Sequence, residues 1–543
     1  MSKPWLKTYG TDIPEFINPK AFPSVTAMFE QAFETYKDQT AFVSLGTSRT
    51  YGEIDEVSRA FAAFLQNDLG VKKGDRIAVM VPNILAFPIA FTGIIRCGAI
   101  QVNVNPMYTP HELQHQLNDS GAETIVIFSG SSPTLAEIVE KTQIKNIITV
   151  NLGDGGDREI PSPPVDPRLS GVIRFSDALE SGKGKTYTAP EITLDDTLFL
   201  QYTGGTTGLS KGAVLSHGNL VANTEQFKAM MPRALRPGKE VVVTALPLYH
   251  VFALMVNLIS YFSIGAKNYL IANPRDPEEL IGTYRDSGFS VSTGVNTLMA
   301  GLVAHPEFAK IDFSNFRLMM GGGAPVLPVT SERWKQVTGE HIREGYGLSE
   351  TSPILCVNPM TVEGFSATVG LPVPSTEIKL LDDLDNEVAM GEAGEICARG
   401  PQVMSGYWNR ADANDKEFTS DGFFRTGDIG VFDEAGFLKI VDRKKDVVLV
   451  SGFNVYPNEI EAHVTELEGV LECAAVGVPS EKTGEAVRLF IVQAPGANLT
   501  VGDVIAHCRK ELTGYKVPHQ VRFIDELPKS TVGKILRREL RDV

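Results

Sequence analysis

A loop rich in glycine and threonine carries the clearest chemical signal in the sequence. Residues 198–217 read LFLQYTGGTTGLSKGAVLSH, in which two apolar runs enclose TGGTTGLSKG. Glycines let backbone N–H groups approach phosphate oxygens, and threonine hydroxyls and Lys211 supply further donors. The loop is not a P-loop, because Ser210 stands where glycine should precede the lysine and AVLSH resembles a strand. We predict a phosphate-binding turn between two strands, with an unliganded polar hairpin as the alternative.

Two further motifs could supply other parts of a nucleotide site. MGGGAP, residues 320–325, has the pattern of a strand followed by a turn that exposes its backbone. EGYGLSET, residues 344–351, places an aromatic ring between glycines and a hydroxyl beside a carboxylate. The ring of Tyr346 could stack on a base, and the carboxylate of Glu350 could hold Mg²⁺.

A third motif, FFRTGDIG at residues 423–430, offers Asp428 in a turn. A carboxylate in such a turn suits the two hydroxyls of a ribose. Each motif alone is a weak signal, because glycine turns and solvated charges are common. Together they predict a protein that binds a nucleotide through its phosphates, base, metal and ribose.

The sequence HELQH, residues 111–115, matches the zinc-protease pattern HExxH. No third ligand of the HxxGxxH type follows, because Asn118, Asp119 and Ser120 come next. We favour a solvated helix face. The five cysteines are scattered without a CxxC pair, which fits a reducing compartment and gives no zinc framework.

Length and charge bound the function further. The chain has 543 residues, which predicts two or more domains. Its net charge of −16 argues against nucleic acid as a partner, because a phosphate backbone needs a basic face. The N-terminal residues MSKPWLKTYGTDIPEF lack the apolar core of a signal peptide.

Two long uncharged runs require a choice between membrane span and buried core. One lies between Arg76 and Arg96 and the other between Glu240 and Lys267. Each opens with a β-rich piece, breaks at proline and continues as a helix-like segment. We therefore predict a strand, a turn and a buried helix in both runs.

The distribution of strand-like segments predicts an α/β protein. Runs such as RIAVMV, ETIVIF, NIITV, TLFLQYT and EVVVTAL alternate with helical stretches through the first 360 residues, which favours a parallel sheet covered by helices. Residues 361–441 have short strands and many glycines, which suggests a small antiparallel β-barrel. We predict a large N-terminal domain at 1–441 that includes this barrel, a charged hinge at 442–446, and a small mobile α+β domain at 447–543.

The order of the motifs resembles that of the adenylate-forming superfamily, which includes acyl-CoA synthetases, luciferases and peptide-synthetase adenylation domains. The matching motifs are YTGGTTGxxKG, GGGAP, EGYGLSE, RTGDIG, DRKKD, SGFNVYPNEIE and PKSTVGK, and they span nearly the whole chain. TGGTTG, PLYHVFAL, NPRDPEEL, STGVNTL and IVDRKKDVVLVSGFNVYPNEIE most resemble bacterial long-chain fatty-acid–CoA ligases. The resemblance implies that ATP activates a long-chain fatty acid as an acyl-adenylate, with loss of pyrophosphate and with Mg²⁺ as cofactor. Coenzyme A then takes the acyl group and AMP leaves.

The resemblance also implies a role for each matching residue. The phosphates are bound by Thr203, Gly204, Gly205, Thr206, Thr207, Gly208 and Lys211. The adenine lies against Gly323, Ala324, Pro325 and Tyr346, and the nucleotide site also includes Glu344, Gly345 and Gly347. Asp428 and Arg443 hold the ribose, and Glu350 ligates Mg²⁺. Ser349, where relatives usually have threonine, and Lys534 act on the carboxylate and the α-phosphate; with Glu350 and Lys211 they form the implied catalytic set.

The second half-reaction is expected to use a different orientation of the C-terminal domain. The resemblance places the hinge at Lys445, where relatives often carry aspartate. It places Gly452, Phe453 and His250 along the pantetheine channel. The apolar residues 251–264 form either one wall of the acyl tunnel or an ordinary core helix.

Several alternatives remain open in the sequence. The runner-up function is a medium-chain or aryl acid–CoA ligase, since tunnel length decides the substrate. A different class is a non-catalytic nucleotide-binding relative. We expect a cytoplasmic protein, and the sequence leaves peripheral contact with the inner membrane and a homodimer open.

Overall fold

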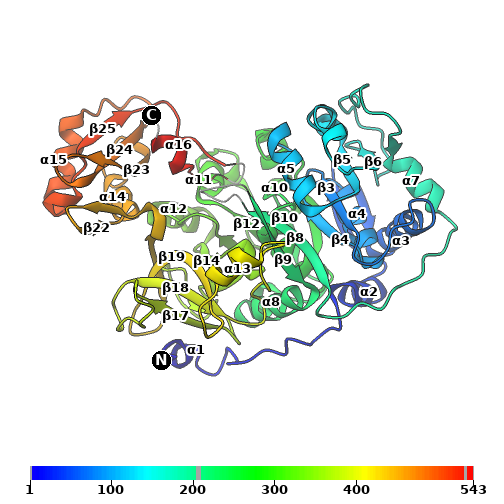
Figure 1. Ribbon diagram of the computed structural model, residues 1–543, viewed down its shortest axis with the longest axis horizontal. Coiled ribbons are helices and arrows are strands. Elements are labelled where there is room, and N and C mark those ends of the chain that lie inside the picture. Colours follow the sequence, from blue (N-terminus) through cyan, green and yellow to red (C-terminus); the bar gives the residue numbers. More distant parts are fainter. Residues whose placement is uncertain (1–2, 204–209, 531–532, 534, 542–543) are drawn as a thin grey trace. The chain divides into compact units, whose positions relative to one another are not determined.

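The computed structural model describes residues 3–203, 210–530, 533 and 535–541 (Figure 1). The chain divides into two compact units. The large unit comprises Tyr9–Glu377 and Arg399–Phe418. The small unit comprises Met1–Thr8, Ile378–Ala398 and Thr419–Val543.

The first sheet of the large unit has seven strands in the order β7-β6-β5-β3-β4-β8-β9. All neighbouring pairs are parallel except β8 and β9, which form an antiparallel hairpin. The strands are β3 (Arg76–Met80), β4 (Ile100–Asn103), β5 (Thr124–Phe128), β6 (Asn146–Val150), β7 (Ile173–Arg174), β8 (Thr197–Thr203) and β9 (Lys211–Ser216). The associated helices are α2 (Val25–Thr35), α3 (Tyr51–Asn67), α4 (Ala86–Arg96), α5 (Pro110–Ser120), α6 (Ser132–Ala136) and α7 (Phe175–Gly182).

The second sheet has nine strands in the order β16-β15-β14-β13-β12-β10-β11-β1-β2. Its central strands, from β14 to β1, run parallel. The strands are β1 (Thr40–Ser44), β2 (Thr47–Thr50), β10 (Val241–Thr244), β11 (Lys267–Leu270), β12 (Val291–Gly294), β13 (Leu318–Gly321), β14 (Arg343–Gly347), β15 (Ile354–Val357) and β16 (Leu371–Pro372). The helices are α8 (His217–Met230), α10 (Pro277–Ser287), α11 (Asn296–Ala304) and α12 (Pro328–Thr338).

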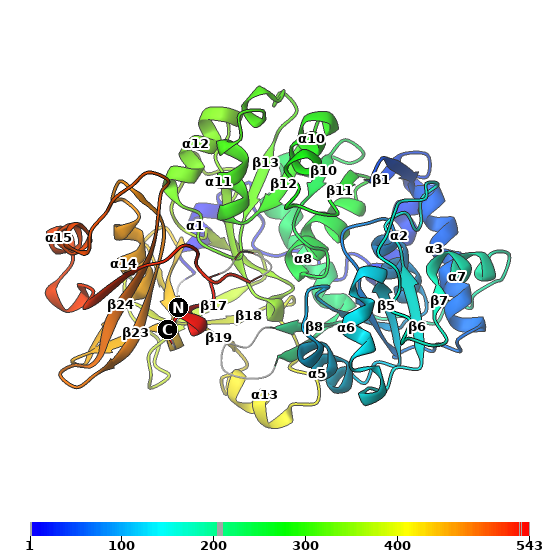
Figure 2. The same cartoon turned by 90° about the horizontal axis from the view of Figure 1, so that it is seen from above.

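Helices α10, α11 and α12 lie beside strands β10, β12 and β13 of this second sheet (Figure 2), and apolar side chains join the helices to the sheet. Tyr284 of α10, Met299 of α11 and Trp334 of α12 are fully buried in one cluster with Val243 of β10 and Met319 of β13. The removal of apolar side-chain surface from water is the main favourable term in folding, and here it joins helices to parallel strands. The predicted parallel sheet covered by helices is confirmed.

Both long uncharged runs are strand–turn–helix segments, as predicted. The first forms β3 and then α4, which is buried along its whole length. The second forms β10, then α9 (Val251–Ala253) and the π-helix η4 (Leu254–Ser260). Among the residues described, no helix combines the length and the apolar character needed to cross a membrane.

The small unit contains two sheets. Strands β17 (Glu377–Leu381), β18 (Gly394–Arg399), β19 (Phe424–Phe432) and β20 (Leu438–Arg443) form a four-stranded sheet where the sequence predicts a small barrel. The other sheet consists of β21 (Val448–Val450), β22 (Phe453–Val455), β23 (Val470–Ser480), β24 (Gly484–Gln493) and β25 (Gln520–Phe523). Its helices are α14 (Pro457–Val464), α15 (Val501–Glu511) and α16 (Arg537–Arg541), which gives the α+β character predicted for the C-terminal part.

The N-terminal helix α1 (Trp5–Tyr9) also contributes to the small unit. Trp5 stacks on Phe432 of β19 with ring centroids 5.4 Å apart. The compact units therefore do not follow chain order, because the four-stranded sheet and residues from the N-terminus group with the C-terminal part. The predicted hinge at 442–446 stays a prediction.

Candidate active site

The predicted phosphate turn connects the two strands of the β8–β9 hairpin. Thr203 and Lys211 stand opposite each other at its end. The residues after the lysine form β9, so the prediction of a strand here is confirmed and a P-loop is excluded. The predicted phosphate ligands Gly204, Gly205, Thr206, Thr207 and Gly208 lie outside the described residues.

The ammonium group of Lys211 has two neighbours in the large unit. Its Nζ lies 3.0 Å from Oε1 of Glu417, the last residue of α13 (Ala411–Glu417). The same Nζ lies 4.8 Å from the ring centroid of Tyr407, within range of a cation–π interaction. The lysine is thus held at the base of the predicted phosphate turn.

Glu350 lies in a short 3-10 helix, η6 (Ser349–Thr351), directly after β14. Glu350 is 8% exposed, and its Oε1 accepts a hydrogen bond of 2.7 Å from the Tyr407 hydroxyl. Burial, followed by the charge of Glu350, raises the pKa of Tyr407 well above its usual range, so the phenol stays protonated and donates. Tyr407 therefore joins two predicted site residues, Lys211 and Glu350.

Sequence reasoning missed Tyr407 and Glu417. Both lie in residues 399–418, a segment that carries no nucleotide motif. The available signal was the aromatic pair in SGYWN, residues 405–409, because a buried tyrosine or tryptophan usually needs a hydrogen-bond partner. That signal does not identify partners so distant in sequence.

The residues predicted to contact adenine lie at the carboxyl ends of the parallel strands β13 and β14. Ligands of α/β proteins commonly bind at this edge of the sheet. Gly323 follows β13 with φ of +77° and is exposed, which confirms the predicted backbone-exposing turn. Ala324 and Tyr346 are half-buried, and Pro325 is exposed.

Glu344 connects this turn to the neighbouring strand β14. The amide N–H of Val326 donates to Oε1 of Glu344 over 3.1 Å, and Glu344 is 6% exposed. Burial raises the pKa of this carboxyl to about 8, with the Val326 hydrogen bond opposing the shift. The Glu344 side chain thus joins the end of the turn, at Val326, to β14.

Gly347 ends β14 where no other residue fits. A Cβ at this position would lie 1.8 Å from the carbonyl oxygen of Pro353. The glycine therefore lets the chain turn closely before Ser349, which is half-buried. Gly345 stands opposite Val357 in the β14–β15 pair.

The two predicted ribose ligands form an ion pair in the small unit. Asp428 of β19 and Arg443 of β20 face each other in register, with Nε of Arg443 3.1 Å from Oδ1 of Asp428. Asp428 is 3% exposed.

The predicted hinge residue Lys445 lies in the 3-10 turn η7 (Lys444–Asp446), and its side chain reaches solvent. Partial burial, and then the charge of Arg443, lower the pKa of Lys445 to about 8. Lys534, the remaining catalytic candidate, lies outside the described residues.

Gly452 occupies a two-residue turn between β21 and β22. Ser451 has φ of +53° and Gly452 has φ of +84°, the pattern of a type I′ hairpin turn. Among the described atoms, none lies within 4 Å of a Cβ placed on Gly452, so the backbone conformation accounts for the glycine here. The next residue, Phe453, is 55% exposed and stacks on Tyr515 with centroids 4.7 Å apart.

His250 and the apolar run after it belong to the large unit. Nδ1 of His250 accepts a 3.3 Å hydrogen bond from Phe252 N–H and so caps α9. The following π-helix is buried throughout. π-Helices occur often at functional sites, yet core packing alone also explains this burial, so the two interpretations of residues 251–264 stay open.

The HELQH segment has a structural explanation. Glu112 is the N3 residue of a capping box that starts α5: it accepts a 2.8 Å hydrogen bond from Thr109 N–H. His111 and Glu112 are exposed, as predicted. His115 is half-buried, and its Nε2 donates to the carbonyl oxygen of Ser210 over 2.8 Å, which links α5 to the start of β9.

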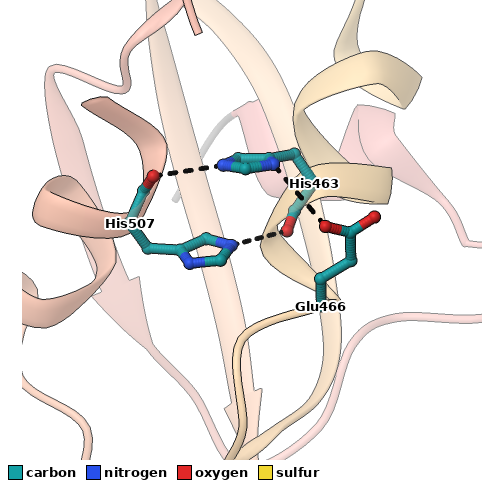
Figure 3. Close-up of side chains that lie close together, drawn as sticks. All are labelled: His463, Glu466 and His507. Atoms are coloured by element: carbon teal, nitrogen blue, oxygen red, sulfur yellow. Dashed lines mark hydrogen bonds and ion pairs between the residues drawn. The ribbon is translucent and has the colours of Figure 1, made fainter. Parts of the chain in front are cut away.

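Within the described residues, one group of side chains brings three candidate metal-binding atoms together: His463, Glu466 and His507 (Figure 3). The imidazole rings stack 4.3 Å apart at 17°, and each Nε2–H donates to the other residue's carbonyl oxygen, over 3.1 and 2.9 Å. Imidazole lone pairs lie in the ring planes, and two nearly parallel planes do not converge on one ion. The pair instead fastens α14 to α15.

Comparison with known proteins defines the class to which this fold and these motifs belong. The chain belongs to the AMP-binding enzyme family, whose main domain matches residues 29–408 and whose C-terminal domain matches residues 459–534. This confirms the adenylate-forming superfamily predicted from the motifs.

Particular relatives match the chain along its whole length. A long-chain-fatty-acid–CoA ligase of Salmonella typhimurium (strain LT2) is 53% identical over 553 positions, covering 100% of this chain and 98% of the relative. The protein of the same name from Haemophilus influenzae is 43% identical, with 100% and 98% coverage. The crystal structure of ATP-bound MatB from Rhodopseudomonas palustris is 28% identical, with a TM-score of 0.83 and coverage of 96% and 98%.

Proposed function

We propose that this chain is an AMP-forming long-chain fatty-acid–CoA ligase. In the first half-reaction, the fatty carboxylate attacks the α-phosphorus of ATP, and pyrophosphate leaves with the electrons of the broken P–O bond. In the second, the thiol of coenzyme A attacks the acyl carbon, a thioester forms and AMP leaves. The observation that carries this proposal is the 53% identity, over the full chain, to a protein of that name.

The first half-reaction needs neutralised charge and alignment, because a carboxylate must approach an anionic phosphate. Lys211 at the β8–β9 turn provides positive charge for the β- and γ-phosphates. Ser349 offers a hydroxyl to the carboxylate or α-phosphate, and Lys534 offers an ammonium group between them. Asp428 and Arg443 hold the ribose, and Tyr346 stacks on the adenine.

Glu350 is the proposed Mg²⁺ ligand. Its carboxylate oxygens suit a hard divalent cation, and the hydroxyl of Tyr407 fixes Oε1, as expected around a metal ligand. When bound, Mg²⁺ supplies charge neutralisation on the phosphate oxygens. The fit of the residues supports Glu350 in this role.

The second half-reaction uses the small C-terminal domain in a second orientation. We place the domain boundaries at 1–441 and 447–543, with the hinge at 442–446 and Lys445 as its pivot. Gly452, Phe453 and His250 line the path of the pantetheine thiol. We further propose that the enzyme is cytoplasmic and takes up its fatty acid at the inner membrane surface. Sedimentation with lipid vesicles tests this membrane contact. Light scattering measures the number of subunits.

A panel of straight-chain acids from C6 to C18, together with an aryl acid, tests the proposed function. AMP release is measured with each acid in the presence of ATP and coenzyme A. The proposal expects kcat/KM to rise toward the long-chain acids. A maximum at C6 to C10, or with aryl acids, would assign a different ligase, and no AMP with any acid would assign a non-catalytic relative.

A further inference from the structure

Tyr407 contacts two residues of the proposed ATP site with two different parts of its side chain. Its hydroxyl donates to Oε1 of Glu350 over 2.7 Å. The face of its ring lies 4.8 Å from Nζ of Lys211. One phenol thus connects the proposed metal ligand after β14 with the proposed phosphate ligand at the start of β9.

The main chain around Tyr407 is anchored on β9. The carbonyl of Gly406 accepts from Val214 N–H over 3.0 Å, and Trp408 N–H donates to the carbonyl of Gly212 over 2.8 Å. These bonds lie on both sides of Tyr407 and join its backbone to β9, the strand that begins with Lys211.

Asn414 fixes the same residue from the side of α13. Its Oδ1 accepts from Tyr407 N–H over 2.7 Å, and its Nδ2 donates to the Tyr407 carbonyl over 3.2 Å. Tyr407 is 8% exposed. A buried ring with both backbone groups bonded has little freedom, so its hydroxyl and its face hold fixed directions.

Fixed directions matter for both partners. A carboxylate whose orientation is set in advance loses less freedom when a cation binds, and hydrogen bonds to a metal ligand typically change metal affinity by about 10–100-fold. A cation over an aromatic face gains about 0.5–1 kcal/mol at an exposed site, which is about a 2–5-fold effect.

We propose that Tyr407 is a positioning residue: its hydroxyl orients Glu350 toward the divalent cation, and its ring holds Lys211 toward the β- and γ-phosphates. The inference rests on the proposed function, because it assigns those two ligands. It requires the two effects of Tyr407 to be separable, since the hydroxyl serves one partner and the ring serves the other.

Calorimetric binding of ATP to the full-length protein, in EDTA and in increasing Mg²⁺, separates the two effects without turnover. Tyr407→Phe keeps the ring and removes the hydroxyl. We expect wild-type ATP affinity in EDTA and a loss of about 10–100-fold in apparent Mg²⁺ affinity. Tyr407→Leu removes both the hydroxyl and the ring. For this variant we expect the same loss of Mg²⁺ affinity and, in EDTA, a fall in ATP affinity of about 2–5-fold.

Tyr202→Phe is the matched control. In the wild type, Tyr202 lies on the adjoining strand β8 and is 6% exposed, and its hydroxyl donates to Asp119 over 2.7 Å. We expect wild-type binding in both conditions. Glu350→Gln is the reference, and Tyr407→Phe added to Glu350→Gln should not weaken Mg²⁺ binding further, because the carboxylate that Tyr407 orients is already lost.

The outcomes distinguish the positioning role from the proposed function. If Glu350→Gln weakens Mg²⁺ binding and a folded Tyr407→Phe protein does not, the positioning role is overturned and the function stands. If neither variant changes Mg²⁺ dependence, both Glu350 as metal ligand and the role of Tyr407 are overturned. An equal loss in Tyr202→Phe would show a general packing effect and would also overturn the inference.

Discussion

Arg443 and Asp428 face each other across β20 and β19, and Nε of the arginine lies 3.1 Å from Oδ1 of the aspartate. The carboxylate is almost fully buried, whereas the guanidinium is about a third exposed. The arginine therefore fixes the direction of a carboxylate that has little solvent around it. A ribose held by this pair would meet a preformed acceptor.

We predict that Asp428→Asn raises KM for ATP by about tenfold or more, with a smaller fall in kcat. Hydrogen bonds to a charged group contribute about 1.5–3 kcal/mol, and a ribose contact is similar before and during reaction. Steady-state kinetics measure both constants. Asp385→Asn breaks an exposed ion pair with Arg425 on the same sheet and should leave KM unchanged. An unaltered KM in Asp428→Asn would remove this residue from the ribose site.

We predict that Gly452→Leu blocks thioester formation and spares adenylation. The side chain would narrow the path of the thiol arm, whereas ATP–pyrophosphate exchange does not use that path. The φ of +84° makes leucine strained by about 1–2 kcal/mol, so Gly452→Asn is the control, because asparagine tolerates this conformation. Equal loss of both half-reactions in Gly452→Leu, at wild-type circular dichroism, would contradict a role in the thiol path.

We predict that His217 makes the protein less stable as pH falls from 6.5 to 4. His217 is 2% exposed, its Nδ1 accepts from Val25 N–H over 3.2 Å, and burial lowers its pKa to about 4. Between pH 6.5 and 4, the unfolded chain binds a proton that the folded chain does not, so the free energy of unfolding falls by up to about 3 kcal/mol.

Urea unfolding at pH 7 and pH 4.5 measures this contribution of His217. His217→Asn keeps an acceptor near Nδ1 and removes the titration, so its stability should depend less on pH than that of the wild type. His305→Asn, at an exposed turn where Nδ1 accepts from Glu307 N–H, is the matched control. Parallel pH curves for His217→Asn and wild type would disprove this source of acid sensitivity.

We predict that Lys534→Ala slows adenylation by about 10²–10³ and leaves thioester formation near the wild-type rate. Losing one electrostatic contact in the transition state costs about 3–4 kcal/mol. After pyrophosphate leaves, the repulsion that Lys534 offsets is gone. Two single-turnover assays, one from ATP and one from prepared acyl-adenylate, measure the steps separately. A folded variant impaired equally in both would contradict a mechanism with two domain orientations.

The sequence predicts local structure well where glycines and β-branched residues set it. The strand after Lys211 and the open turn at Gly323 follow from neighbouring residues alone. So does the strand–turn–helix pattern of the two uncharged runs, because proline and periodicity act over a few residues.

Features that depend on distant contacts could not be predicted in this way. Tyr407 meets Glu350 and Lys211 only because residues 406–408 pair with β9. The grouping of Trp5 with Phe432 depends equally on tertiary packing. The motifs thus indicate which chemistry is present, and the fold decides which residues support it.

The central claim is that the protein makes an acyl-adenylate and passes its acyl group to coenzyme A. The direct measurement follows α-³²P-labelled ATP and ¹⁴C-labelled oleate with Mg²⁺, first without coenzyme A and then after its addition, with released pyrophosphate assayed enzymatically. We predict oleoyl-adenylate and pyrophosphate in equal amounts in the first stage, and AMP and oleoyl-CoA in equal amounts in the second. Formation of ADP and phosphate, or of no labelled adenylate at all, would contradict the account.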